Sequence, residues 1–185
     1  MVRQHNTSGG GSQTNHNGLK FERDTDFSEL VSQLEKYNLE EIIYDDKKKY
    51  RGFDVYRDDK FVGKIVPHTR FYDWLKENNL ENTNAKQWDP DECFINYENK
   101  TVYIIEKKWQ QTSGSVDEKL FGFGNNRRLY QRILDSVEDP FSVQFVFVGN
   151  DFFKQKSYRD YFEMLRGDGV KIMIDEYDMV YFSLY

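Results

Sequence analysis

Acidic and basic residues that could act together on a phosphate group lie in the middle of the chain, in the segments DECFINY and KTVYIIEKKWQ. Both segments have the character of β-strands, and Glu98 and Asn99 between them suit a tight hairpin turn. Alternate side chains of a strand share one face. One face of the second segment therefore turns from apolar to polar along Val102, Ile104, Glu106, Lys108 and Gln110.

The hairpin is expected to bring two carboxylates together. With Glu98 and Asn99 as turn residues, paired positions sum to 197, so Asp91 lies directly across from Glu106. Such cross-strand neighbours have Cβ atoms only ~5 Å apart, and two carboxylates this close repel each other unless a cation lies between them. Mg²⁺ binds one or two carboxylates together with water and phosphate oxygens. We therefore expect Asp91 and Glu106 to bind Mg²⁺, with Lys108 directed at the same point.

The order Pro90-Asp91, strand, Glu106-Lys107-Lys108 resembles the PD-(D/E)XK nuclease superfamily, over roughly residues 88–149. The continuation from Gln110 through SGSVDEKL into a helix is similar to certain type II restriction endonucleases of this superfamily. The resemblance implies that Asp91 and Glu106 bind Mg²⁺ and that Lys108 orients or activates the attacking water. Gln110 either positions phosphate or water or is a plain polar residue at a strand end.

A type II restriction endonuclease is expected to cut double-stranded DNA as a homodimer, because two-fold symmetry brings one active centre to each strand. The residues assigned to DNA contact are Lys107, Ser113, Ser115, Lys119, Arg127 and Arg128. For Ser115, capping of the following helix is the simpler role. The basic runs at residues 47–51 and 127–132 could also contact DNA, although such runs are more often solvated faces.

Other interpretations of these residues stay open. Glu106 and Lys108 could end an exposed strand without a catalytic role. Glu92 is the rival of Asp91, but alternation directs it to the opposite face. His68 could act as a base or be a loop residue. A further metal ligand could come from a helix carboxylate, for which the candidates are Glu29, Glu35 and Glu77.

The elements around the hairpin predict a mixed α/β fold, a restriction-endonuclease-like core with a central mixed β-sheet flanked by helices. Residues 1–18 have almost no apolar content, which indicates a flexible tail, and residues 19–185 are expected to form one domain. Helices are expected over residues 26–37, 69–79, 115–134 and 158–167. Strands are expected at EEIIY, GFDVYRD, FVGKIV, SVQFVFVG, VKIMID and MVYFSL, with SVQFVFVG central.

Composition limits the partners and the compartment. A formal net charge of −6 argues against a general nucleic-acid coat protein, because phosphate binding depends on Lys and Arg. It suits an interaction module that keeps the fold without catalysis, which is one alternative; a repair, recombination, phage or structure-selective nuclease is another. The single cysteine, Cys93, favours a reducing cytoplasm. No apolar run reaches the ~20 residues of a membrane span.

Overall fold

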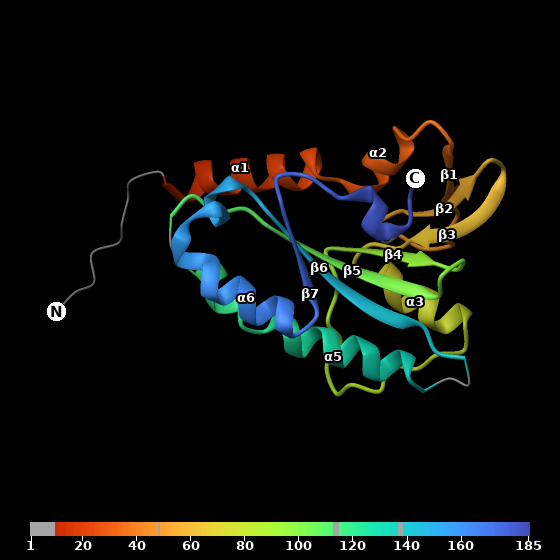
Figure 1. The fold of residues 1–185 in the computed structure, drawn as a ribbon. Coiled ribbons are helices and arrows are strands. Elements are labelled where there is room, and N and C mark those ends of the chain that lie inside the picture. Colours follow the sequence, from red (N-terminus) through yellow and green to blue (C-terminus); the bar gives the residue numbers. More distant parts are fainter. Residues whose placement is uncertain (1–9, 48, 113–114, 137–138) are drawn as a thin grey trace.

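The computed structural model describes residues 10–47, 49–112, 115–136 and 139–185. Within these residues, seven strands form one sheet whose spatial order follows the chain (Figure 1). Neighbours from β1 to β5 are antiparallel, whereas β5, β6 and β7 run parallel. The predicted mixed sheet is therefore confirmed. The strands are β1 (Tyr37–Ile42), β2 (Gly52–Arg57), β3 (Lys60–Ile65), β4 (Glu92–Asn96), β5 (Thr101–Lys108), β6 (Ser142–Gly149) and β7 (Val170–Ile174).

Helices cover both faces of the sheet, as predicted. They are α1 (Gly10–Asp24), α2 (Phe27–Ser32), α3 (Arg70–Glu77), α4 (Ser115–Leu120), α5 (Phe123–Leu134) and α6 (Arg159–Gly167), with the 3₁₀ turns η1 (Asp151–Lys154), η2 (Lys156–Tyr158) and η3 (Met179–Phe182). Parallel strands need crossover connections, and these are α4 with α5 between β5 and β6, and α6 between β6 and β7. Figure 1 shows α3, α5 and α6 on one side of the sheet and α1, α2 and the C-terminus on the other.

The alternation of side chains along β5 explains the two layers. Val102 and Ile104 belong to a core under α3, α5 and α6, whereas Tyr103 and Ile105 belong to a second core under α2 and η3. Because both of its faces are apolar, β5 can lie inside the sheet with helices on either side. The strand becomes polar at its end, where Glu106 and Lys108 are half-buried and Lys107 is buried.

The first helix differs from the sequence-based expectation. Residues 10–18, expected to belong to a flexible tail, form the first part of α1; residues 1–9 lie outside the described residues. Lys107 Nζ donates hydrogen bonds to the carbonyls of Glu22 (3.0 Å) and Thr25 (3.2 Å), which anchors the end of α1. A helix that is already held at one end extends without a new nucleation cost.

Other boundaries also differ. The segment MVYFSL, expected as a strand, contains the 3₁₀ turn η3, because the Phe182 ring packs 4.8 Å from Phe27 and 5.0 Å from Tyr103. Short apolar runs fit either kind of element. The helix expected over residues 26–37 ends at Ser32, and the one expected over 115–134 is divided into α4 and α5. The single domain expected over residues 19–185 stays a prediction.

Helices with the length and apolar character of a bilayer-spanning segment do not occur among the residues described.

Candidate active site

The β4–β5 hairpin has the register that the sequence predicted. Glu92 pairs with Ile105, so paired positions sum to 197. The turn is fixed locally, because the Asn96 side chain accepts hydrogen bonds from the backbone N–H groups of the two turn residues, at 2.9 and 3.2 Å. Asparagine commonly stabilises turns in this way. The hairpin thereby brings Asp91, which directly precedes β4, to the polar end of β5.

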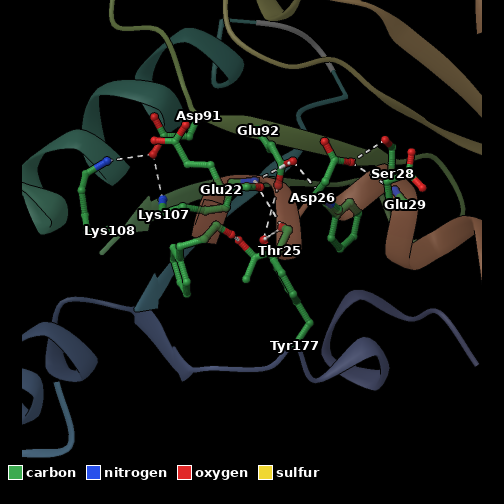
Figure 2. Close-up of polar contacts among 12 residues, drawn as sticks. Glu22, Thr25, Asp26, Ser28, Glu29, Asp91, Glu92, Lys107, Lys108 and Tyr177 are labelled. Carbon is green, nitrogen blue, oxygen red and sulfur yellow. Dashed lines mark hydrogen bonds and ion pairs between the residues drawn. The ribbon is translucent and has the colours of Figure 1, made fainter. Parts of the chain in front are cut away.

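Asp91, Glu106 and Lys108 meet at this end of the hairpin. Lys108 Nζ lies 2.7 Å from Asp91 Oδ2 and 2.9 Å from Glu106 Oε2. Asp91 Oδ2 also accepts a hydrogen bond from the backbone N–H of Lys107 at 2.8 Å, which holds the carboxylate against β5 (Figure 2). The side chains of the three cluster residues are between 14% and 29% exposed, so the cluster is mostly buried but still accessible to water.

Burial and neighbouring charges set the protonation of this cluster. Burial, and then the Asp91 carboxylate, raise the pKa of Glu106 to about 7. Burial alone would lower the pKa of Lys108, but the Glu106 and Asp91 carboxylates outweigh it and raise that pKa above its ordinary value. Lys108 is therefore an ammonium at neutral pH, while Glu106 gains or loses a proton near neutrality. Perturbed groups of this kind are typical of functional sites.

The cluster offers two carboxylates to a metal ion. Over the described parts of the chain, no group of three or more His, Cys, Asp or Glu side chains is placed to hold a metal. Mg²⁺ fits the smaller donor set, because it commonly binds through one or two carboxylates and completes its shell with water and phosphate oxygens. The positive charge between Asp91 and Glu106 is supplied here by Lys108.

A second buried ion pair lies on the opposite face of the hairpin. Glu92 Oε1 lies 3.0 Å from Lys107 Nζ and accepts a hydrogen bond from the Phe27 N–H at 3.0 Å (Figure 2). Burial raises the pKa of Glu92 to about 7, against the effect of Lys107. Glu92 faces away from Glu106, as alternation predicted, and the pair anchors the junction of α1 and α2 to the sheet.

The contacts of Lys107 favour a structural role for its side chain over the expected DNA contact, which stays a prediction. Its side chain is only 5% exposed, and its ammonium is used by Glu92 and by the carbonyls at the end of α1. The physical reason is strand alternation, which directs Lys107 to the face opposite Lys108.

Gln110 lies beyond the end of β5 and is buried in a different set of contacts. Its Nε2 donates to Asp117 Oδ1 at 3.2 Å and to the Tyr158 hydroxyl at 3.3 Å. Its backbone N–H and C=O each form a 2.9 Å hydrogen bond with the Asn150 side chain. These bonds tie the end of β5 to α4, η2 and the turn after β6. They favour a structural role for Gln110 over the expected catalytic one.

The other residues assigned to DNA contact lie along or next to α4 and α5. Lys119 and Arg128 are exposed. Arg127 is half-buried, and its Nε is a buried donor for which the described residues provide no hydrogen-bond partner. Ser113 lies outside the described residues, and so does the side chain of Ser115 at the start of α4. Contact of these residues with DNA stays a prediction.

A cleft of about 540 Å³ opens beside Asp91, on the α1 and α2 side of the sheet. One of its walls carries Tyr50 and His68, whose rings stack with centroids 3.9 Å apart. Half-burial lowers the pKa of His68, although Asp91 opposes this effect, so the imidazole is neutral at neutral pH. The sequence had suggested His68 as a base or a loop residue, but no local signal pointed to Tyr50.

Helix carboxylates border the same cleft. Of the three that were candidates for a further metal ligand, Glu29 lines the cleft, whereas Glu35 and Glu77 are not among its lining residues. Glu22 of α1 also lines it. No local pattern pointed to Glu22, because its position depends on a contact between α1 and Lys107, 85 residues away along the chain.

Comparison with known protein families agrees with this geometry. The model of the PD-(D/E)XK nuclease superfamily domain matches residues 28–133, a span that includes Asp91, Glu106 and Lys108. No curated protein and no solved structure matches the chain. The family match covers more than half of the chain, and the fold is the mixed sheet flanked by helices that the resemblance implied. The chain therefore belongs to the PD-(D/E)XK nuclease superfamily.

Proposed function

We propose that the protein is a Mg²⁺-dependent endonuclease that hydrolyses phosphodiester bonds of double-stranded DNA at specific sequences, as type II restriction endonucleases do. The observation that carries the proposal is the contact of Lys108 Nζ with both Asp91 (2.7 Å) and Glu106 (2.9 Å). Two carboxylates and an ammonium that converge on one point suit a divalent ion and a phosphate.

The residues of the cluster have separate parts in this proposal. Asp91 and Glu106 hold the metal ion, which when bound polarises the scissile phosphate and lowers the pKa of a bound water. Glu106 must lose its proton to bind the ion, and its pKa of about 7 places that loss near neutral pH. Lys108 orients the attacking water and offsets negative charge on the phosphate as a compact point charge.

The proposed assembly and compartment follow from the same features. The described part of each chain contains one such cluster, so cutting both strands at one site calls for two chains, and a two-fold symmetric homodimer supplies them. Cys93 is a free, buried thiol, which fits the reducing cytoplasm.

A specific observation favours a second function with the same chemistry, a structure-selective nuclease. The cleft beside Asp91 has an aromatic wall of Tyr50 and His68, and aromatic rings stack on bases that are unpaired. Digestion of plasmid DNA separates the two functions. Discrete fragments require sequence reading, whereas a smear or a preference for branched DNA does not.

The test of the chemistry is cleavage of plasmid DNA in Mg²⁺ by the wild type and two matched variants. Glu106→Gln should lower the cleavage rate by at least about 100-fold, since even groups that only support a metal ligand are worth about 10- to 100-fold. Glu98→Gln is the control, because Glu98 also pairs with basic side chains, Arg57 at 2.8 Å and Lys60 at 3.2 Å, but lies at the opposite end of the hairpin and does not line the cleft. Undiminished cutting by Glu106→Gln would contradict the proposal.

Calorimetry of Mg²⁺ binding separates a nuclease from an interaction module on the same fold. Binding to the wild type that is lost in Glu106→Gln and kept in Glu98→Gln is expected for the nuclease. A pure interaction module need not bind the ion at Glu106.

A further inference from the structure

The cleft beside Asp91 has a wall that suits a nucleobase. Tyr50 and His68 both line it, with ring centroids 3.9 Å apart and an angle of 29° between the ring planes. Its volume of about 540 Å³ is in the range of sites for single small molecules. Asp91 lines the same cleft, whereas Glu106 and Lys108 do not, so a ligand in the cleft reaches the candidate metal site at Asp91.

The scaffold fixes the backbone of both residues of this wall. Arg70 Nε donates to the Tyr50 carbonyl at 2.7 Å, and the Arg70 side chain is only 3% exposed. The backbone N–H of His68 donates a hydrogen bond to the carbonyl of Pro90, the residue before Asp91, at 3.0 Å. His68 has a φ of 50°, a left-handed conformation that costs energy for a residue other than glycine. Such strain persists where the surroundings impose it, and it is common at binding sites.

Charge in the cleft is divided between its two sides. Lys49 and Arg51 flank Tyr50 on one side, and the Arg51 side chain is 71% exposed. In the described part of the chain, Arg51 pairs only with Glu41, at 3.0 Å, and such an exposed ion pair contributes little stability. The side formed by α1 and α2 carries one arginine, Arg23, among three carboxylates, Glu22, Asp26 and Glu29. A phosphate backbone is therefore favoured along the side of Lys49 and Arg51.

We infer that this cleft binds one unpaired nucleotide of the DNA strand that is cut, with its base against Tyr50 and His68 and its phosphates along Lys49 and Arg51. The inference rests on the proposed function, because it takes Asp91 to lie at the scissile phosphate. A base inside a duplex is stacked and paired, so it must leave the helix to enter a pocket, at a cost that is least where it is already unpaired. DNA with an unpaired nucleotide is therefore the preferred ligand.

Binding tests this inference independently of cutting. The Glu106→Gln protein is titrated, by fluorescence anisotropy, into labelled DNAs of one sequence: a full duplex, the same duplex with a short unpaired stretch, and the single strand. Stacking of a base on an aromatic side chain is worth about 5- to 150-fold in affinity. DNA with unpaired nucleotides should bind at least about fivefold more tightly than the duplex, and Tyr50→Ala should remove this preference.

Further variants distinguish an effect of losing an aromatic ring from an effect of losing the folded structure. Tyr50→Phe keeps the ring and should bind as Tyr50 does, whereas His68→Asn removes the ring but tolerates a positive φ, and should weaken binding to unpaired DNA. Lys49→Gln should reduce the slope of the logarithm of the affinity against the logarithm of the salt concentration, by the amount that corresponds to about one phosphate contact. Tyr185→Ala is the matched control, because Tyr185 is an exposed aromatic residue that does not line the cleft. Thermal unfolding of each variant verifies its fold.

The inference and the proposed function can fail separately. Equal affinity for duplex and unpaired DNA, or a preference that Tyr50→Ala and His68→Asn leave intact while both variants are folded, overturns the inference even if the wild type cuts DNA. A preference that depends on Tyr50 in a protein that cuts no DNA supports the nucleotide site and overturns the proposed nuclease activity.

Discussion

Lys108 is the residue on which the geometry of the cluster depends. Its ammonium lies within 3 Å of a carboxylate oxygen of both Asp91 and Glu106, which otherwise repel each other. In the proposed function, a divalent ion held by the same two carboxylates would take over this neutralising part. The metal affinity of the proposed site would then depend on the charge of this one lysine.

A measurement of the stability of a Lys108 variant, with and without Mg²⁺, therefore tests the proposed metal site. Lys108→Met should lower the free energy of unfolding by about 3–5 kcal/mol at about pH 8, since it removes one partner of a buried pair. Saturating Mg²⁺ should restore much of this loss, as measured by thermal unfolding. Lys107→Met is the control, because it also leaves a buried carboxylate, Glu92, but on the opposite face. Equal effects of Mg²⁺ on both variants would speak against a metal site at Asp91 and Glu106.

The raised pKa of Glu106 predicts a pH dependence with a definite sign. Its pKa is about 7 in the folded protein and 4.5 ordinarily, so the folded state holds the proton more tightly. Where the folded state binds more protons, the free energy of unfolding falls as pH rises. The contribution of Glu106 should therefore fall between about pH 4.5 and 7 and change little above that.

Urea unfolding of the wild type and Glu106→Gln across this range isolates the contribution of Glu106. The stability of the wild type relative to the variant should decrease as pH rises, and the Mg²⁺ affinity of the wild type should increase over the same range. A stability difference that is independent of pH would mean that Glu106 has an ordinary pKa.

At the scale of elements, local patterns predicted the hairpin and the positions of the three cluster residues relative to it. Alternation along β5 and a turn closed by Asn96 are set by residues close in sequence, and the predicted register was correct. The long-range contacts could not be predicted. The anchoring of α1 by Lys107 and the stacking of Tyr50 on His68 depend on how distant segments meet, which no periodicity encodes.

The segment between β1 and β2, described over residues 43–47 and 49–51, is held by Arg70 of α3. The guanidinium donates to both carboxylate oxygens of Asp46 at 2.8 Å and to the Tyr50 carbonyl at 2.7 Å, and it stacks 3.6 Å from the centre of the Tyr44 ring. Lysine cannot reproduce this planar, multiple contact, although it keeps the charge. Arg70 thus determines where the basic and aromatic side of the cleft lies.

Arg70→Lys should therefore release this segment. The loss of hydrogen bonds to charged groups should lower the free energy of unfolding by about 2–3 kcal/mol, or the melting temperature by about 5–10 °C. Limited digestion with trypsin should cut after Lys47, Lys49 or Arg51 much faster than in the wild type. Arg159→Lys, at an exposed arginine paired with its neighbour Asp160, should change neither quantity. Unchanged digestion of Arg70→Lys would show that other contacts hold the segment.

At the scale of the whole molecule, the formal charge of −6 opposes the approach of DNA. Basic side chains must therefore be used locally, and the structure places Lys49 and Arg51 at the cleft and Lys119 and Arg128 in exposed positions on α4 and α5. Few phosphate contacts imply weak binding by a single chain. A second chain doubles the contacts without changing the charge pattern of either.

Cutting of both strands should therefore depend on dimer formation. At concentrations where light scattering gives twice the 22.3 kDa mass of the chain, supercoiled plasmid should become linear directly, because two symmetry-related Glu106 sites act on the two strands. Dilution below the dimer range should let nicked circles accumulate. A mixed dimer with Glu106→Gln should nick only, since one of its two sites is inactive. Direct linearisation by a protein that stays at the single-chain mass on DNA would contradict the dimer and require one cluster to cut both strands in turn.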